Sequence, residues 1–290
     1  MPKMLAEKKQ AAAFRWWSGL SPKGKRIACI CAGWLLTAAV IALDTGITVP
    51  VYKIFSGKVQ SPMRIVLLTD FHSSSYGKNQ QVLIDTIDRQ NPDVILMAGD
   101  IAENFRPHKH TEELLEKLTY RYRCYYVTGN HEEWSGECDA IKEMFRSYGV
   151  NVMEGDSEIF ETSGQAIRIS GADNSLPFMQ LSACYKNAGD GIFTVFMSHR
   201  PDLVDLYSGR GFDLVVCGHA HGGQVRIPGI LNGLYAPNQG MFPKYAGGRY
   251  RLADGKTEMI VSRGLCKNSL PRIFNPPEVV VIDILPRELN

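Results

Sequence analysis

The sequence has almost no net charge and no repetitive stretch. Thirty-two Lys and Arg residues against 30 Asp and Glu residues leave a formal charge of +2 over 290 residues. The charge balance therefore gives no reason to expect nucleic acid as the main partner. Internal repeats and low-complexity tracts are also missing, and hydrophobic residues make up 44% of the chain. A chain of this length and composition can bury one sizeable core, which excludes a mini-scaffold and a disordered protein.

Cysteine is scarce as well, and its spacing shows no pairing. The chain has seven cysteines, an odd number, with no CxxC and no zinc-knuckle spacing. They stand at positions 29, 31, 124, 138, 184, 217 and 266. Neither a disulfide framework nor a cysteine-based zinc site is expected. Most of these cysteines should instead be small buried hydrophobes.

Only one hydrophobic run is long enough to cross a membrane. It covers residues 27–43, contains no charged residue, and exceeds the usual hydrophobic region of a signal peptide. No small-residue cleavage site precedes Asp44, so we expect an uncleaved single-pass anchor. The alternative, a buried helix of a soluble domain, is disfavoured because the run is apolar on every face.

Basic residues are distributed unequally around this run. Those upstream include Lys8, Lys9, Arg15, Lys23, Lys25 and Arg26, whereas only Lys53 and Lys58 follow within twenty residues. The asymmetry predicts a cell-membrane protein with the N-terminus inside and the bulk of the chain outside. Four segments are therefore expected: a basic cytoplasmic N-terminus at 1–26, a transmembrane anchor at 27–43, a linker at 44–61 and a globular domain at 62–290.

The globular domain has the pattern of an α/β fold. Short β-branched runs alternate with helical segments, as in a sheet covered by helices. Helices are expected at 80–89 and 112–119, and strands at 64–69, 93–97, 124–128, 166–170, 193–198, 214–217, 258–262 and 278–285. Residues 222–251, rich in Gly and Pro, should form long loops with short strands, in a position to face a substrate.

Clusters of polar residues follow five of the predicted strands directly. They read Asp70-Phe71-His72, Gly99-Asp100, Gly129-Asn130-His131-Glu132, Ser198-His199 and Gly218-His219-Ala220-His221. Five of the seven histidines fall in these clusters. In an α/β sheet, ligands bind outside the carboxyl ends of the strands, so we expect these side chains to form one site.

The residue types in these clusters indicate a metal site. Carboxylate, imidazole and amide oxygen donors together suit Mn²⁺, Fe or Zn²⁺ better than Ca²⁺, which prefers oxygen ligands. The candidate ligands number seven, too many for one ion: Asp70, His72, Asp100, Asn130, His199, His219 and His221. Two divalent ions with a bridging carboxylate would accommodate them, and such a pair catalyses phosphoester hydrolysis.

The order D-x-H, G-D, G-N-H-E, S-H and G-H-x-H resembles that of the calcineurin-like metallophosphoesterases. The resemblance covers residues 64 to about 285, and the flanking text GHAHGGQVRIPG, VSRGL and NPPEVVVIDIL is similar to the membrane-anchored bacterial branch of that superfamily. It implies a four-layer α/β/β/α sandwich of two mixed sheets. It also implies two ligand sets that share one carboxylate: Asp70, His72 and His221 for one ion, Asn130, His199 and His219 for the other, and Asp100 between them.

The remaining histidine of these clusters, His131, matches the non-ligand histidine of the family. The resemblance implies that it stabilises the phosphoryl charge or protonates the leaving oxygen. The residue type supports the same role, because histidine ordinarily titrates near neutral pH and can donate a proton to a leaving alkoxide. Of the two divalent ions, Mn²⁺ is expected first, with Fe or Zn²⁺ as alternatives.

The sequence departs from the serine/threonine protein phosphatases after Asp100. It continues Ile-Ala-Glu-Asn-Phe where those enzymes carry Asp-Arg-Gly, so their phosphate-binding arginine is missing. Arg200 and Arg263 are candidates to replace it, although surface salt bridges explain both equally well. Glu103 and Asn104 could either contact the site or cap a loop. His108 and His110 are expected to be solvated rather than to bind metal.

An anchored hydrolase favours a membrane-associated or lipid-linked phosphate ester as substrate. The loop 241–245, Met-Phe-Pro-Lys-Tyr, offers apolar and basic groups for a headgroup. The resemblance implies a phosphodiesterase or pyrophosphatase of the kind that acts on UDP-diacylglucosamine. A broad-specificity phosphomonoesterase is the alternative, and a non-catalytic scaffold that binds phosphorylated ligands is the alternative of another class. Nothing in the sequence specifies an oligomeric state.

Overall fold

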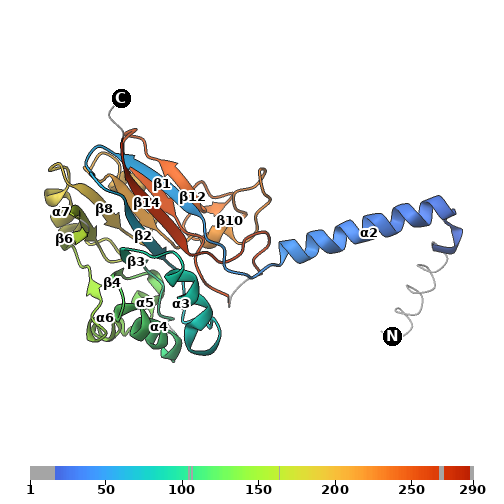
Figure 1. Ribbon diagram of the computed structural model, residues 1–290, viewed down its shortest axis with the longest axis horizontal. Coiled ribbons are helices and arrows are strands. Elements are labelled where there is room, and N and C mark those ends of the chain that lie inside the picture. Colours follow the sequence, from blue (N-terminus) through green and yellow to red (C-terminus); the bar gives the residue numbers. More distant parts are fainter. Residues whose placement is uncertain (1–16, 104, 106, 163, 268–270, 288–290) are drawn as a thin grey trace. The chain divides into compact units, whose positions relative to one another are not determined.

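The chain forms two compact units in the computed structural model (Figure 1). They are Met1–Asp44 and Thr45–Asn290. The structure describes residues 17–103, 105, 107–162, 164–267 and 271–287.

Helix α2, Pro22–Ala42, is the long helix of the first unit. It starts with a standard cap: the Ser21 hydroxyl accepts a hydrogen bond from the Gly24 amide at 3.1 Å, and proline occupies the first turn. Within the described residues it is the one helix long and apolar enough to cross a membrane, with a mean hydropathy of 1.6 and no protein covering it. Its 21 residues rise about 31 Å.

Helix α2 begins five residues before the predicted anchor. Lys23, Lys25 and Arg26 lie in its first turns, because lysine and arginine are good helix formers and the Ser21 cap precedes them. The apolar run therefore forms the rest of a longer helix.

Two mixed sheets of six strands each make up the second unit. The first has the order β1 (Val51–Ser56), β14 (Val280–Pro286), β2 (Met63–Leu68), β3 (Val94–Ala98), β4 (Arg123–Val127), β5 (Asn151–Val152). The second has the order β12 (Gly248–Arg251), β13 (Glu258–Val261), β9 (Leu214–Cys217), β8 (Phe193–Met197), β7 (Gln165–Gly171), β6 (Ser157–Thr162).

Helices and short elements surround the sheets. The α-helices are α3 (Gln81–Asp88), α4 (Lys109–Thr119), α5 (Asn130–Trp134), α6 (Cys138–Ser147) and α7 (Phe178–Asn187). The short elements are η1 (Lys78–Gln80), η2 (Val204–Leu206), η3 (His221–Gly223) and the hairpin of β10 (Tyr235–Ala236) with β11 (Gly240–Met241).

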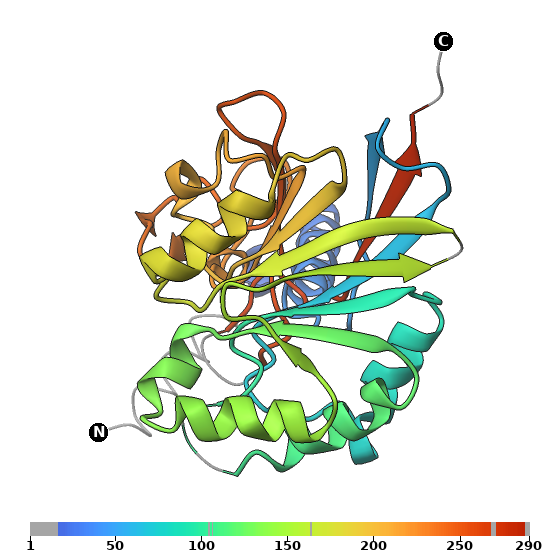
Figure 2. The ribbon, with the colours of Figure 1, turned by 90° about the vertical axis from the view of Figure 1, so that its left-hand side faces the viewer.

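The elements stack in four layers (Figure 2). Between the sheets, inward side chains such as Leu67 of β2 and Val195 of β8 form one fully buried cluster. A second cluster joins the outer face of the first sheet to α3, α4 and α6, where Tyr126 and Phe145 stack with ring centroids 3.8 Å apart. A third joins the second sheet to α7. The predicted α/β/β/α sandwich of two mixed sheets is therefore confirmed.

Strand direction defines one functional edge of this sandwich. Strands β2, β3, β4 and β5 run parallel in the first sheet, and β7, β8, β9 and β13 run parallel in the second. We call the edge at which these strands end the carboxyl edge. Strand β14 is antiparallel to β2, and β1 is parallel to β14, so β1 begins at the carboxyl edge and ends at the opposite one.

The segment expected to be a linker contains a strand of the fold. Strand β1 lies within residues 44–61 and pairs with β14 over six residues, and the compact unit begins at Thr45 rather than residue 62. Only Ile54 of this edge strand is fully buried, so the sequence shows no clear alternation of apolar and polar residues.

The cysteines differ in burial. Cys124, Cys184, Cys217 and Cys266 are buried, as expected, while Cys29 and Cys31 on α2 are exposed.

Candidate metal centre

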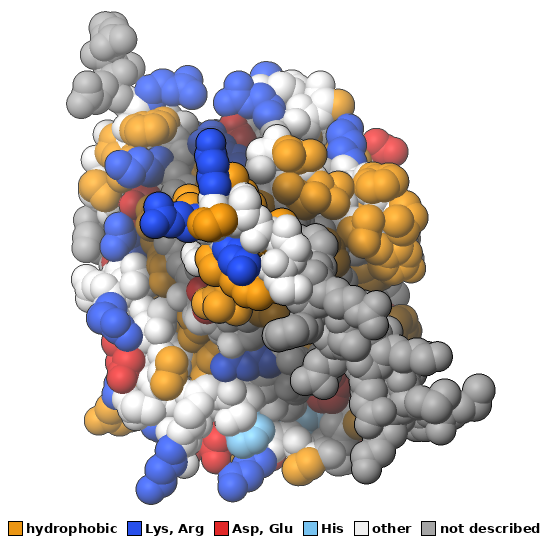
Figure 3. Space-filling view, turned by 90° about the vertical axis from the view of Figure 1, so that its right-hand side faces the viewer, with side chains coloured by type: hydrophobic (Ala, Val, Ile, Leu, Met, Phe, Trp, Pro, Cys, Tyr) orange, Lys and Arg blue, Asp and Glu red, His pale blue; other side chains and the backbone are white. Residues whose placement is uncertain are grey.

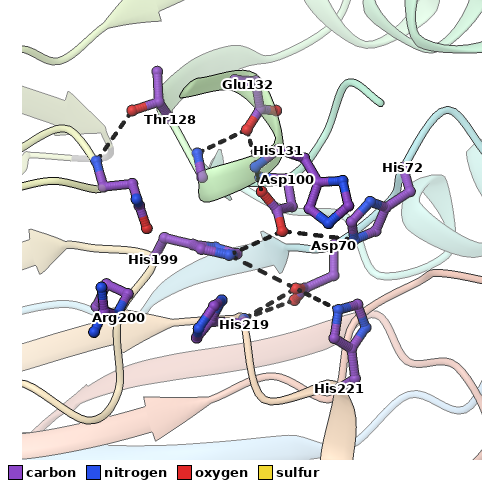
Figure 4. Close-up of polar contacts among 12 residues, drawn as sticks. Asp70, His72, Asp100, Thr128, His131, Glu132, His199, Arg200, His219 and His221 are labelled. Carbon is purple, nitrogen blue, oxygen red and sulfur yellow. Dashed lines mark hydrogen bonds and ion pairs between the residues drawn. The ribbon is translucent and has the colours of Figure 1, made fainter. Parts of the chain in front are cut away.

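The polar loops that follow the strands meet at the carboxyl edge (Figure 4). Strand β2 leads to Asp70 and His72, β3 to Asp100, β4 to Asn130 and His131, β8 to His199, and β9 to His219 and His221. Asp70, Asp100 and His199 are at most 1% exposed. The sequence clusters thus converge on one buried site, with donors from both sheets.

Two glycines allow the loops to approach one another. A Cβ atom on Gly129 would lie 2.1 Å from Asp100 Oδ1, and one on Gly218 would lie 2.5 Å from Asp70 Oδ2. Side-chain carbon atoms do not come this close to carboxylate oxygens, so a larger residue would displace one of the carboxylates. Glycine at these positions permits the packing of the site.

Several of the converging residues adopt left-handed backbone. Their φ angles lie between 46° and 68° at Asp70, His72, Asp100, His219 and His221. Such conformations are uncommon for residues other than glycine and persist where the surrounding structure enforces them. The loops therefore hold their side chains in geometry that the isolated peptide would not choose.

Six of the side chains form two donor groups that share Asp100. In the first, ligand atoms of Asp70, His72, Asp100 and His221 lie within 4.8 Å of one another; in the second, so do those of Asp100, His199 and His219. Asp100 Oδ2 is 3.1 Å from His199 Nε2 and 3.6 Å from His72 Nε2. One carboxylate therefore faces both groups at once.

Several polar side-chain atoms of the seven candidate ligands are buried and form no hydrogen bond with the described residues. They are His72 Nε2, His199 Nε2, His221 Nδ1 and the Asn130 side-chain oxygen. A buried polar atom without a partner is costly unless a ligand satisfies it. Imidazole nitrogens, carboxylates and an amide oxygen are donors that Mn²⁺, Fe and Zn²⁺ accept, so the residues present fit divalent cations.

The site stabilises positive charge near its carboxylates. Burial alone would raise the pKa of Asp70, but His221 and His199 hold it below its ordinary value. Burial also opposes a charge on His72, yet the Glu103 hydrogen bond and Asp100 raise its pKa to about 10. In contrast, burial lowers the pKa of His221 to about 4. A metal ligand must be a neutral imidazole, so His72 would release its proton when a cation binds, whereas His221 is already neutral.

Hydrogen bonds fix the orientation of two ring ligands. The Nδ1 atom of His199 lies 2.9 Å from the Ala98 carbonyl oxygen, so Nδ1–H donates to the backbone and Nε2 faces Asp100. The Nε2 atom of His219 lies 2.7 Å from the side-chain oxygen of Asn238. Partners of this kind set the tautomer and angle of a metal-binding histidine.

Glu132 is not among the candidate ligands of the sequence, but it connects the loops that follow β3 and β4. It is fully buried and accepts hydrogen bonds from the backbone amides of Asp100, Ala102 and Gly129 at 2.7–3.0 Å. Burial and the charge of Asp100 raise its pKa to about 7. The capping position three residues after Gly129 is the one sequence signal for this role.

His131 lies beside the first donor group and is about one quarter exposed in its side chain. Its ring centroid is 4.4 Å from that of His72, and its Nδ1 atom is 2.9 Å from Glu103 Oε1. Glu103 Oε2 is also 3.3 Å from His72 Nδ1. Of the two roles open to Glu103, contact with the site or a loop cap, the structure shows contact with the site. Asn104 lies outside the described residues.

The other open candidates belong to neither donor group. Arg200 is paired with Asp202 through two hydrogen bonds of 2.6–2.8 Å, and Arg263 is paired with Glu278. The salt-bridge interpretation therefore holds for both arginines. His110 pairs with Glu113 at the start of α4 and belongs to neither donor group.

Sequence comparisons give the family. The profile of the calcineurin-like phosphoesterase family matches residues 63–223. The uncharacterized metallophosphoesterase YkuE of Bacillus subtilis is 28% identical over 76% of this chain and 78% of its own length. Phosphodiesterase YaeI of Escherichia coli is 24% identical over 78% of this chain and 83% of its own.

A relative from Danio rerio, "Transmembrane protein with metallophosphoesterase domain", is 24% identical over 86% of this chain; the chain spans 58% of that protein. The family match extends over more than half of the sequence and includes every loop that contributes a donor. The chain belongs to the calcineurin-like phosphoesterases and is a metal-dependent phosphoester hydrolase.

Proposed function

We propose that the protein is a binuclear phosphodiesterase or pyrophosphatase that acts on a membrane-associated or lipid-linked substrate. The observation that carries the proposal is the position of Asp100, whose carboxylate belongs to both donor groups. Two cations that share an oxygen ligand are the arrangement that phosphoester hydrolysis uses.

The ligands divide between two cations as the sequence motifs suggest. Asp70, His72 and His221 would hold one cation, Asn130, His199 and His219 would hold the other, and Asp100 would contribute to both. The two donor groups support this division, and the unpartnered buried oxygen of Asn130 supports its place in the second set. Mn²⁺ is the expected ion, with Fe or Zn²⁺ as alternatives, because this mixed donor set suits all three.

Bound divalent cations would polarise the phosphoryl oxygens and supply an activated water. The residues of the chain provide the remaining functions. His131 stabilises the phosphoryl group or gives a proton to the leaving oxygen, and Glu103, 2.9 Å from its Nδ1 atom, fixes the orientation of the ring. Glu103 receives the Nδ1 proton in a hydrogen bond and is a positioning residue.

The preference for a diester follows from the arginines near the site. Arg200 and Arg263 are both held by carboxylates, so neither is available as a clamp for the second charge of a phosphate monoester. A diester carries one negative charge and needs no such clamp. The phosphodiesterase name of the Escherichia coli relative supports the same choice.

The membrane location rests on α2 and its flanking charges. The helix has the length and hydropathy of a span, and the Danio rerio relative is named a transmembrane protein. The proposed cytoplasmic position of the N-terminus follows from the excess of Lys and Arg before the apolar run 27–43. A catalytic domain tethered outside the membrane meets substrates that the bilayer presents.

Metal analysis combined with two matched substrates tests the proposal. The purified full chain should hold two divalent ions, and should hydrolyse bis-p-nitrophenyl phosphate at least about tenfold faster than p-nitrophenyl phosphate, both at saturating Mn²⁺. Asp100→Ala should lose metal and activity together, because both donor groups lose a ligand. Two ions retained in that variant would refute the bridge, and a preference for the monoester would refute the phosphodiesterase assignment.

A further inference from the structure

A group of large apolar side chains is exposed beyond the metal centre, between η3 and β12. We call it the apolar rim and define it as Ile227, Ile230, Tyr235, Met241 and Phe242. Ile230 is 84% exposed and Phe242 is 67% exposed. Figure 3 shows the face of the molecule that lies on the right in Figure 1, and apolar side chains gather toward the right of that face. Clustered exposure of this kind marks a contact surface.

The segment that carries the rim is fastened to the metal-centre loops. The Leu234 amide donates to the Gly223 carbonyl at 2.9 Å, and a Cβ atom on Gly223 would lie 2.4 Å from Gly233 Cα. In the turn of the β10–β11 hairpin, Asn238 lies 2.7 Å from His219 Nε2. The rim therefore belongs to the carboxyl edge, and its hairpin directly contacts a proposed metal ligand.

The chain enters the catalytic domain at the same edge. Thr48 is fixed there by a hydrogen bond from its amide to the Pro277 carbonyl at 2.9 Å and by a contact of its hydroxyl with Arg263 at 3.0 Å. Helix α2 ends at Ala42, so the intervening chain reaches at most about 20 Å. If α2 spans a bilayer, this connection keeps the carboxyl edge, rather than the opposite edge, close to the lipid.

The composition of the rim suits the interfacial region of a bilayer. Aliphatic and aromatic side chains insert at the boundary between headgroups and acyl chains, and a neighbouring cation favours anionic lipid. Lys244 follows the rim directly and is exposed, with its ammonium group 5.0 Å from the centre of the Tyr245 ring. Tyrosine and lysine are common anchors at this depth.

We propose that the apolar rim is a lipid-contacting surface that inserts into the headgroup region of the bilayer that α2 crosses. This inference rests on the proposed membrane location and adds the orientation of the catalytic domain. The carboxyl edge faces the bilayer, so the metal centre opens where a lipid-linked phosphoester is presented. The hairpin that meets the lipid also holds His219 through Asn238.

Photo-crosslinking with a matched phenylalanine pair tests the orientation. Benzoylphenylalanine replaces Phe242 in one full-length protein and Phe55 in another, both reconstituted in vesicles of phosphatidylethanolamine and phosphatidylglycerol. Phe55 is 53% exposed at the end of β1, on the opposite edge. We expect lipid adducts at position 242 in at least about tenfold excess over position 55. Equal labelling, or a protein–protein adduct in place of lipid at position 242, would overturn the proposal.

Crosslinking tests the rim proposal separately from the proposed activity and the proposed membrane location. Crosslinking requires no turnover, so an inactive protein would still report the orientation. Release of the wild-type chain from the vesicles by an alkaline carbonate wash would show that α2 is no anchor; that result would overturn the rim proposal together with the membrane location. Retention in the vesicles without adducts at position 242 would overturn the rim proposal alone.

A charge substitution gives the functional test. Met241→Asp with Phe242→Asp places two carboxylates in the rim without altering a proposed ligand. Hydrolysis of a p-nitrophenyl ester of phosphatidic acid in vesicles should fall about tenfold, while soluble bis-p-nitrophenyl phosphate should change less than about twofold. An equal loss on both substrates would mean that the hairpin serves the metal centre alone, which contradicts a lipid-contacting role.

Discussion

Glu103 and His131 illustrate how single residues of this site depend on one another. Glu103 contacts His131 and His72 through its two carboxylate oxygens, at 2.9 Å and 3.3 Å. The backbone amide of His131 also donates to Asp100 Oδ1 at 2.8 Å. The imidazole of His131 is therefore placed by a carboxylate, while its backbone serves the proposed bridging residue.

Replacing His131 by Ala separates these two functions. The backbone hydrogen bond to Asp100 remains, so metal content should stay at the wild-type value. Turnover of bis-p-nitrophenyl phosphate should fall about 10²–10⁴-fold, because the proton donor is lost. Metal analysis and steady-state kinetics on the same preparation check both statements. Loss of the metal from this variant would show that the ring itself is a ligand.

Gly129→Ala tests the close approach of the β4 loop to Asp100. The φ angle of Gly129 is −108°, which alanine adopts without strain, so the effect is purely steric. The new methyl group would overlap Asp100 Oδ1, and we expect a loss of about 1–3 kcal/mol in the free energy of unfolding together with weaker metal binding.

Gly57→Ala is the matched control for this variant, because a Cβ atom at Gly57 meets nothing within 4 Å. Its free energy of unfolding should change by no more than about 0.5 kcal/mol. Urea unfolding and metal titration distinguish the two variants. A Gly129→Ala protein as stable and as metal-rich as wild type would contradict the steric argument.

The candidate donors of this site stand out in the sequence, whereas their supporting residues do not. Asp70, Asp100 and His199 are visible as candidates because each stands two residues after the end of a buried strand. Beyond its local bond to Gly129, Glu132 contacts residues 30 and 32 positions away, and Asn238 contacts His219 at 19 positions; such contacts exist only after folding. Local pattern carries no information on these pairs.

At the scale of elements, the buried strands were predicted within one or two residues. Strand β3, Val94–Ala98, is fully buried on both faces and appears in the sequence as an uninterrupted apolar run. Strands β1 and β6 lie at the outer edges of their sheets, where burial is partial and polar residues interrupt the run. Helices α6 and α7 were likewise missed. Edge elements owe their structure to their neighbours more than to their own composition.

Two truncations test whether β1 belongs to the catalytic domain. A chain that starts at Thr45 retains the strand and should fold as a soluble, cooperative unit. A chain that starts at Pro62 loses the buried Ile54 and Val59 and exposes the edge of β14. Burial of two such side chains stabilises by about 3–6 kcal/mol, so the shorter chain should unfold at much lower urea or aggregate. Equal stability of the two chains would show that β1 does not stabilise the catalytic domain.

At the scale of the whole molecule, the charges around α2 predict its topology. A specific protease site placed between Leu43 and Ile47 should be cut from outside intact cells, releasing the catalytic domain. The same site placed between Trp17 and Ser21 should be cut only after the cells are permeabilised. The reverse pattern of cleavage would invert the proposed orientation.

The donors of the metal centre are divided between the two sheets and therefore between the two halves of the chain. Asp70, His72, Asp100 and Asn130 come from the first sheet, and His199, His219 and His221 come from the second. A gene cut between β5 and β6 would yield two fragments, each with an incomplete coordination sphere. Hydrolysis would then occur only when the two fragments associate, so activity would measure their association.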